Sequence, residues 1–376
     1  MLKKTIYSLK EIDWVLFFAT VLVVSLGLTT MHSFSGDDPY FFRHLMVIAL
    51  SFFVFFGISL MNLRFLRRTG FVVILFLVMA LTLIGMLLFG EVTQGTQRWV
   101  SIGPFSLQLS ELAKLVLVIL LAKYFSKRHI EIASFRHIFI SGVYAVIFFI
   151  LIFLQPDLGS AVIIFLIWLG MIMVSGVSLK HLGVVFLIGV MAFAAMWSFA
   201  LQDYQKERVI SFIKPYADVE GSGYHTRQSV IAIGSGEMFG KGIGYGTQSQ
   251  LRFLPEHHTD FIFAAFAEEW GFVGMALLFF LYGVIIWRLL VNAQKGETNF
   301  ETLFGIGLVV ILISHIVIHA GANLGMMPVT GTTLPFMSFG GSHMVTTFAA
   351  LGMFMAMRRY QRITSKEVIR EEVTVT

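Results

Sequence analysis

The sequence contains no cysteine and little charge, and these two absences narrow the class of protein. Without cysteine, the chain has no disulfide, no thiolate nucleophile and no cysteine-ligated metal. Charged residues make up 13% of the 376 residues, whereas about 25% is typical of a soluble domain. The hydrophobic share is 57% and the mean hydropathy is +0.83. This composition indicates an integral membrane protein.

Long apolar runs recur along the chain, and ten of them come near the ~20 residues that a helix needs to cross a bilayer. The predicted spans are 14–31, 42–61, 70–89, 109–124, 138–154, 158–174, 182–201, 260–287, 302–320 and 341–357. We therefore predict an all-α fold, a polytopic integral membrane protein whose residues 1–376 form a single domain. The long hydrophilic stretch, about 202–259, is expected to form one large extracytoplasmic loop.

Lysine and arginine are distributed unevenly among the connections between these spans. With the N-terminus placed inside, eighteen of the 27 fall on the cytoplasmic side and eight on the outer side. Because positive residues favour the cytoplasmic side, both termini are predicted to be cytoplasmic, including a basic tail at 358–376. The N-terminal lysines precede an apolar run that lacks a small-residue cleavage site, which favours an uncleaved first helix.

The stretch 254–269, which opens the eighth span, carries the strongest indication of chemistry. It places Asp260 where the large polar loop meets an apolar helix. A carboxylate at a membrane boundary is costly, so Asp260 is a candidate functional residue. Carboxylates bind Mg²⁺ together with substrate phosphates, and the sequence therefore allows a divalent cation, Mg²⁺ or Mn²⁺, at Asp260. The adjacent His257 and His258 lack the i, i+4 spacing of a helical zinc pair.

Two other features of this region favour structural explanations. The Gly-Lys of segment 240–246 resembles part of a nucleotide-binding loop, but Ser235 occupies the first glycine position and Gly242 follows the lysine. We therefore reject a nucleotide site. Glu268 and Glu269 lie deeper in the eighth span and are expected to serve helix packing.

Three more segments place polar side chains at the ends of spans. Glu111 and Lys114 lie three residues apart at the start of the fourth span and are expected to pair, either as a structural bridge or beside a wet cavity. Asp157 follows a proline between the fifth and sixth spans, where it either caps the next helix or points into the same outer cavity. Segment 96–108, which contains Arg98, is expected to be re-entrant or interfacial.

The ninth and tenth spans flank a polar loop. His315 and His319 lie at i, i+4 on one face of the ninth span, and helix-packing hydrogen bonds are the expected function of both rings. The loop 321–342 is rich in glycine, proline and hydroxyl residues. We expect it to expose backbone N–H groups, which can bind an anion without a charged side chain.

Taken together, four motifs resemble the SEDS (shape, elongation, division and sporulation) family. They are Gly95-Thr-Gln-Arg98-Trp99 with Gln108-Leu-Ser-Glu111-Leu-Ala-Lys114; Gln155-Pro-Asp157-Leu-Gly-Ser-Ala161; Leu254-Pro-Glu-His-His258-Thr-Asp260-Phe-Ile-Phe with Glu268-Glu269-Trp-Gly271; and Leu334-Pro-Phe-Met-Ser338-Phe-Gly340-Gly341-Ser342. The resemblance extends over about residues 10–362. Within the family, the motifs are more similar to the elongation member than to the division member.

The resemblance implies a peptidoglycan glycosyltransferase that polymerises lipid II on the outer face of the cytoplasmic membrane of a bacterium, for cell elongation and rod shape. It also implies a class B penicillin-binding protein, a transpeptidase, as the partner. Lipid II, the growing glycan strand and membrane lipids are the other expected partners. Neither nucleic acid nor an organic cofactor is expected.

The resemblance also assigns residues. The family's essential aspartate matches Asp260, its intramembrane Glu/Lys pair matches Glu111 and Lys114, and its Pro-Asp turn matches Asp157. Other positions assigned to substrate binding or support are Arg98, His258, Ser338, Gly340 and Gly341. Two positions depart from the family pattern, because Phe339 stands in place of tyrosine and His343 in place of serine.

The chemistry of such a transfer agrees with the residues themselves. Asp260 is positioned to accept the proton of the attacking sugar hydroxyl, and Arg98, Lys114 and the 338–342 loop are the candidates for stabilising the pyrophosphate that leaves. Two alternatives stay open. A flippase for a lipid-linked precursor also needs intramembrane charge, and a scaffold without catalytic activity needs no carboxylate at residue 260.

Overall fold

The computed structural model describes residues 12–33, 39–90, 98–102, 105–127, 135–214, 222–251, 253, 254, 256 and 258–375. The elements of this part are α2 (Trp14–Ser33), α3 (Pro39–Leu60), η1 (Arg64–Arg67), α4 (Thr69–Phe89), β1 (Trp99–Ile102), β2 (Phe105–Gln108), α5 (Leu109–Ser126), α6 (Phe135–Phe153), α7 (Leu158–Val174), α8 (Leu179–Phe199), α9 (Asp203–Ile213), α10 (Ser222–Ser235), α11 (Thr247–Gln250), α12 (Ile262–Gln294), α13 (Asn299–Asn323) and α14 (Gly341–Val375).

Each of the ten predicted spans coincides with a helix, so the prediction of a polytopic helical membrane protein is confirmed. Seven of the helices in the described part are long and apolar enough to cross a membrane. Helix α7 is apolar but shorter, and α5 carries charged residues among its 18. Helix α14 does not end at Met357, where the tenth span was predicted to end, but continues to Val375.

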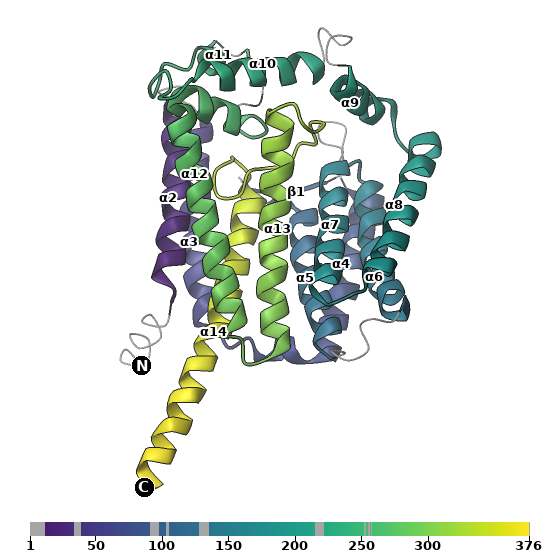
Figure 1. Cartoon of the computed structure of the whole chain (residues 1–376), viewed down its shortest axis with the longest axis vertical. Coiled ribbons are helices and arrows are strands. Elements are labelled where there is room, and N and C mark those ends of the chain that lie inside the picture. The colour runs from purple at the N-terminus through teal and green to yellow at the C-terminus, as the bar shows by residue number, and fades with distance from the viewer. Residues whose placement is uncertain are drawn as a thin grey trace.

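Helix α13 lies in the middle of the bundle (Figure 1). It packs against α12 on one side and against α5 and α7 on the other. Over the most apolar 18 residues of α13, 72% of the residues are buried. The corresponding share is 6% for α8, which lies at the edge of the bundle. Polar side chains on α13 therefore face protein, and α8 presents its apolar residues outward.

The hydrophilic segment predicted as the large loop contains the short helices α9, α10 and α11, which lie across one end of the bundle (Figure 1). Helix α10 packs on α12 and α13, and the Ser229 hydroxyl donates to the Asn323 carbonyl over 2.7 Å. The segment is thus a layer fastened to the bundle.

Helix α12 contains a kink at Gly271, where φ is 64° and ψ is −165°. A kink leaves carbonyl groups of the preceding turn without partners in their own helix. The backbone N–H groups of Lys241 and Gly242 donate to the carbonyls of Glu268 and Glu269, over 2.9 and 3.1 Å. The glycine-rich segment that resembles a nucleotide loop therefore binds the protein's own helix at its kink.

The side chains of Glu268 and Glu269 strengthen the same attachment. Glu268 is fully buried, and its Oε1 accepts hydrogen bonds from Lys241 Nζ at 2.7 Å and from the Gln248 N–H at 3.1 Å. Glu269 Oε1 accepts from the Gly244 N–H at 3.0 Å. The pair is buried and structural, as expected, but these bonds join residues 241–248 to α12 and do not pack one long helix on another.

At the opposite end of the bundle, Asp13 connects three helices. Its Oδ1 caps α2 by accepting from the Leu16 N–H at 3.1 Å. Its Oδ2 accepts from Arg288 and Asn292 of α12, each at 2.6 Å, and lies 3.1 Å from Arg358 of α14. Burial alone would raise the pKa of Asp13, but the hydrogen bonds from Arg288 and Asn292 hold it below its ordinary value.

The segment ahead of α5 contains a hairpin that the sequence analysis did not predict. Strands β1 and β2 pair antiparallel, with Trp99 opposite Gln108 and Ile102 opposite Phe105. The expected re-entrant or interfacial placement of this segment stays a prediction. Four-residue strands contain too few residues to show the alternation of apolar and polar side chains that identifies a strand. Gly103 and Pro104, between the two strands, lie outside the described residues.

Candidate active site

The Glu111–Lys114 pair forms as predicted in the first turns of α5. Lys114 Nζ lies 2.7 Å from Glu111 Oε1, and both side chains are less than a tenth exposed. A buried ion pair needs further hydrogen bonds to offset the loss of hydration. Glu111 and Lys114 each have a further hydrogen-bond partner, and the two partners come from two other helices.

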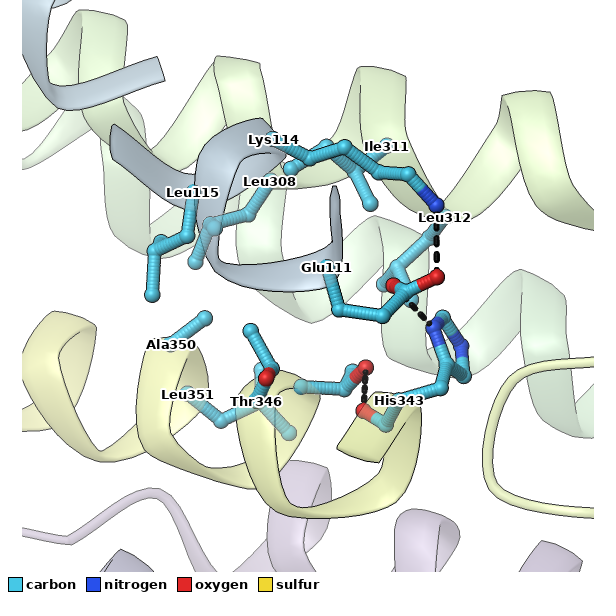
Figure 2. A pocket seen from close by; sticks show the side chains of 11 residues that line it. Glu111, Lys114, Leu115, Leu308, Ile311, Leu312, His343, Thr346, Ala350 and Leu351 are labelled. Carbon is cyan, nitrogen blue, oxygen red and sulfur yellow. Dashed lines mark hydrogen bonds and ion pairs between the residues drawn. The ribbon is translucent and has the colours of Figure 1, made fainter. Parts of the chain in front are cut away.

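Those partners are histidines from α13 and α14. His343 Nδ1 lies 2.8 Å from Glu111 Oε2, and Lys114 Nζ lies 3.3 Å from His315 Nε2. Figure 2 shows Lys114 and His343 approaching the Glu111 carboxylate from different sides. The two histidine rings lie 4.3 Å apart between centroids. Four buried side chains from α5, α13 and α14 thus form one cluster, which we call the buried cluster (Glu111, Lys114, His315 and His343).

Three members of the buried cluster also have the chemistry of metal ligands. Among the described residues, Glu111, His315 and His343 offer ligand atoms that all lie within 4.8 Å of one another. However, the Lys114 ammonium already contacts Glu111 and His315 at 2.7 and 3.3 Å. A metal ion bound there would displace it and leave an unpaired charge in the bundle, which costs several kcal/mol. We therefore assign no metal to this cluster.

One face of α13 carries three polar residues spaced four apart, His315, His319 and Asn323. His315 Nδ1 lies 3.1 Å from the carbonyl of Thr333, and His319 Nδ1 lies 2.7 Å from the carbonyl of Thr332. The two histidines thus make the expected packing hydrogen bonds. Because both carbonyls belong to the connection between α13 and α14, the rings hold that connection against α13.

Asp260 lies in the turn just before α12, half-buried, and the same connection passes beside it. A Cβ atom built on Gly331 would lie 3.7 Å from Asp260 Oδ2. The backbone carbonyl of Asp260 accepts from Asn323 Nδ2 at 2.8 Å, and Asn323 Oδ1 accepts from the Ala264 N–H at 3.2 Å. Asn323 therefore fixes the turn that presents the Asp260 carboxylate, and the sequence analysis did not single it out.

The charges around Asp260 come from three separate segments of the chain. The pKa of Asp260 is raised to about 6, chiefly because burial disfavours the charged carboxylate, and the negative charge of Glu256 raises it further. Arg208 on α9 and Arg98 before β1 oppose this shift. The ion pairs among the described residues do not include Asp260. Its carboxylate can therefore accept a proton near neutral pH.

Asp157 caps α7, as one of the two interpretations predicted. Its Oδ1 accepts from the Ser160 N–H at 3.1 Å, while its Oδ2 accepts from Gln108 Nε2 at 2.8 Å. Arg98 Nη1 lies 3.8 Å from Oδ1. Asp157 thus joins the hairpin to α7 and places a negative charge beside Arg98. It is not among the residues that line the pocket of Figure 2.

The expectation of exposed N–H groups in the loop before α14 is wrong for several residues. The Leu334 N–H donates to Ser338 Oγ at 2.8 Å, and the Phe339 N–H donates to the His258 carbonyl at 2.9 Å. Ser338 Oγ in turn donates to the Thr259 carbonyl at 2.9 Å. These polar groups are used to hold the turn that contains Asp260, so we do not assign anion binding to them.

Gly340 and Gly341 provide close packing where this loop meets the hairpin. A Cβ atom on Gly340 would lie 2.8 Å from the Thr333 side chain, and Gly341 begins α14. The next residue, Ser342, accepts from the Gln108 N–H at 2.7 Å and donates to the Ser106 carbonyl at 2.8 Å. The first turn of α14 is thereby joined to β2.

Comparisons with known proteins agree with this geometry. The family described as FtsW/RodA/SpoVE cell cycle proteins matches residues 8–363. The chain belongs to the SEDS family. The peptidoglycan glycosyltransferase MrdB of Escherichia coli K12 is 33% identical over 370 residues, which cover 97% of this chain and 98% of MrdB. The predicted enzyme class, a peptidoglycan glycosyltransferase, is confirmed by such relatives.

Solved structures resemble this SEDS chain over nearly its full length. A chain from a structure titled "Structural coordination of polymerization and crosslinking by a peptidoglycan synthase complex" has a TM-score of 0.80 and 31% identity, covering 93% of this chain and 98% of that one. The rod shape determining protein RodA of Thermus thermophilus has a TM-score of 0.70 and 30% identity, covering 93% of this chain and 97% of that one.

Sequence reasoning missed several polar residues of this SEDS site. Asn323 extends the four-residue spacing of His315 and His319, and that spacing was the available signal. Arg208 carries no local signal, since it is one basic residue among several in the hydrophilic segment 202–259. His343 was noticed only as a departure from the family pattern, because its contact with Glu111 joins residues 232 positions apart.

Proposed function

We propose that this chain polymerises lipid II into glycan strands, with Asp260 as the base of the transfer. The observation that supports the proposal is the environment of that carboxylate. It is half-buried in the turn just before α12 and its pKa is raised to about 6. Groups with a pKa near the working pH are the most effective general bases.

The transfer balances as follows. The 4-hydroxyl oxygen of the acceptor sugar forms a bond to the anomeric carbon of the donor, and the bond from that carbon to the pyrophosphate oxygen breaks. Asp260 accepts the hydroxyl proton, and the polyprenyl pyrophosphate leaves with the electron pair. We take the growing strand as the donor and a new lipid II as the acceptor.

The leaving pyrophosphate needs positive charge close to the reacting carbon. We assign this function to Arg98 and Arg208, whose charges already act on Asp260. Lys114, a candidate from the sequence, is only 2% exposed and is bonded within the buried cluster. It is therefore a structural residue in this proposal.

A divalent cation fits the same carboxylates. Asp260 and Glu256 are close enough for the charge of one to raise the pKa of the other, and oxygen ligands of this kind suit Mg²⁺ or Mn²⁺ together with phosphates and water. When bound, the ion would neutralise charge on the pyrophosphate. The Asp260 and Glu256 carboxylates would hold it.

The setting of the reaction follows from the distribution of charge. We propose that the protein lies in the cytoplasmic (inner) membrane of a bacterium with α9–α11 and Asp260 on the outer side and with both termini inside. Its partner is a class B penicillin-binding protein, a proposal supported by the similarity to a chain of a peptidoglycan synthase complex. The motif similarities favour cell elongation.

The test is formation of glycan strands from purified lipid II and a divalent metal, by the full chain alone and with the partner transpeptidase. Asp260→Asn preserves the shape of the side chain and removes the base, and we expect a loss of at least about 100-fold in rate, as general-base catalysis contributes on that order. Glu237→Gln is the matched control, because Glu237 is an exposed acidic residue of the outer segment, and it should keep the wild-type rate.

Two alternatives correspond to different results of this experiment. Equal polymer from wild type and Asp260→Asn would remove Asp260 from catalysis. Absence of polymer in every condition, with lipid II crossing a vesicle bilayer instead, would indicate a flippase. Absence of both activities, with full stimulation of the transpeptidase, would indicate a scaffold.

A further inference from the structure

The donor and the acceptor of each hydrogen bond in the buried cluster can be assigned. The Thr333 carbonyl can only accept, so His315 Nδ1 carries a proton, and the Lys114 ammonium can only donate, so His315 Nε2 accepts from it. His343 Nδ1 donates to the Glu111 carboxylate, which also accepts from Lys114. A chain of bonds therefore runs from His343 through Glu111, Lys114 and His315 to the backbone at Thr333.

This chain of bonds ends beside the candidate base. Thr333 lies two residues after Gly331, where an added Cβ atom would lie 3.7 Å from Asp260 Oδ2. The neighbouring Thr332 carbonyl is held by His319, so both carbonyls are anchored on α13. The orientation of His315 therefore affects the position of the backbone next to Asp260.

We propose that His343 is a positioning residue for the transfer: its Nδ1–H orients Glu111, and through Lys114 and His315 this fixes the backbone beside Asp260. His343 is 5% exposed and lies in the first turn of α14, on a different element from any other member of the buried cluster. It supplies the second hydrogen bond that a buried Glu–Lys pair needs. The proposal rests on the polymerase function proposed above.

The position of the donor nitrogen makes the proposal specific. Nδ1 of histidine is the second atom beyond Cβ, and Nδ2 of asparagine occupies the same place. His343 Nε2 has no hydrogen-bond partner among the described residues. Asparagine therefore retains the one bond that is used, whereas glutamine, also an amide, places its nitrogen one atom farther out.

The experiment measures kcat and KM for polymerisation of lipid II by the full chain with its partner transpeptidase. We expect His343→Asn to stay within about threefold of wild type and His343→Gln and His343→Leu to lose about tenfold in kcat, with KM changed less than about twofold, since misplacing a catalytic geometry lowers rate more than binding. Thr346→Val is the matched control. Thr346 lines the same pocket one turn along α14, its hydroxyl has no partner among the described residues, and the variant should match wild type.

A double variant tests whether His343 acts through the chain of bonds. His315→Leu also interrupts the chain, so His343→Leu and His315→Leu together should lose no more than the worse of the two alone. Losses that multiply would overturn the proposal, as would wild-type kcat for His343→Leu or an equal loss for His343→Asn and His343→Gln. His343→Asn and His343→Gln decide the question even if the leucine variants fail to fold.

The result can be separated from that for Asp260. The His343 variants are compared by their rate of polymerisation. This comparison does not depend on which group is the base. If Asp260→Asn polymerises normally while the His343 series behaves as expected, the assignment of the base fails and the function of the chain of bonds stands. The reverse pattern would remove His343 alone.

Discussion

The two carboxylate oxygens of Asp157 face different partners, and one of them caps α7, the first of the two interpretations that the sequence left open. Oδ1 accepts from the Ser160 N–H and lies 3.8 Å from Arg98, while Oδ2 accepts from Gln108. The first bond is an N-cap and needs only an oxygen. The attraction to Arg98 requires the negative charge of Asp157. Two substitutions can therefore distinguish the hydrogen bond of the cap from the interaction between charges.

Asp157→Asn keeps an oxygen for the cap, whereas Asp157→Ala removes it. We expect the alanine variant to be about 1 kcal/mol less stable than the asparagine variant, the usual cost of losing an N-cap. Thermal unfolding in detergent measures the difference. Equal stability of the two variants would show that the cap does not contribute, and a normal rate in both would remove the charge of Asp157 from catalysis.

At the scale of elements, the kink in α12 is the feature that attaches the hydrophilic segment 202–259 to the bundle. Gly271 has φ 64° and ψ −165°, a conformation that is essentially confined to glycine. A Cβ atom there would also lie 2.2 Å from the Gly240 nitrogen. The kink and the segment around residue 240 therefore require each other.

We expect Gly271→Ala to destabilise the protein by about 1–3 kcal/mol or more, the cost of backbone strain plus the clash. Gly283→Ala in the same helix is the matched control, because a Cβ atom there has no neighbour within 4 Å. Alanine favours a helix over glycine, so the control should be at least as stable as wild type. Equal melting temperatures for Gly271→Ala and wild type would contradict this view of the kink.

The helices were predictable because long apolar runs have few alternatives in a membrane protein. The spans 14–31 and 302–320 lie within the observed helices α2 and α13. The β1–β2 hairpin was not predictable from strands of four residues. The hydrogen bonds of the N–H groups around Ser338 were not predictable either. A glycine-rich composition shows that the backbone can bend, but it does not show which groups the backbone contacts.

At the scale of the whole molecule, the site depends on contacts between distant parts of the chain. Asp260 was predictable because neighbouring residues in the sequence show that it lies between a hydrophilic stretch and an apolar run. Arg208 and the bond between His343 and Glu111 were not, because they come together only when α9 and α14 pack in the fold. A single sequence shows which residues are in unusual positions, such as a carboxylate beside an apolar run. It does not show which of these residues contact one another in the fold.

The convergence of charges on Asp260 gives the protein a defined pH dependence. Its pKa in the folded protein, about 6, lies above the ordinary 3.8. Between these values the folded state binds more protons, so lowering the pH stabilises it through this group. Asp13 has a lowered pKa, and its contribution to stability is lost only below its ordinary value of 3.8. Neither group explains a loss of folding near pH 6.

The most direct test is therefore the initial rate of polymerisation between about pH 5 and 8, for wild type, Glu256→Gln and the control Glu237→Gln. Asp260 acts as a base only when ionised, so the wild-type rate should fall as the pH drops through about 6. Removing the charge of Glu256 should shift this fall to lower pH, and Glu237→Gln should leave it in place. A rate that is constant across pH 6, or a fall that Glu256→Gln does not move, would contradict the assignment of Asp260 as the base.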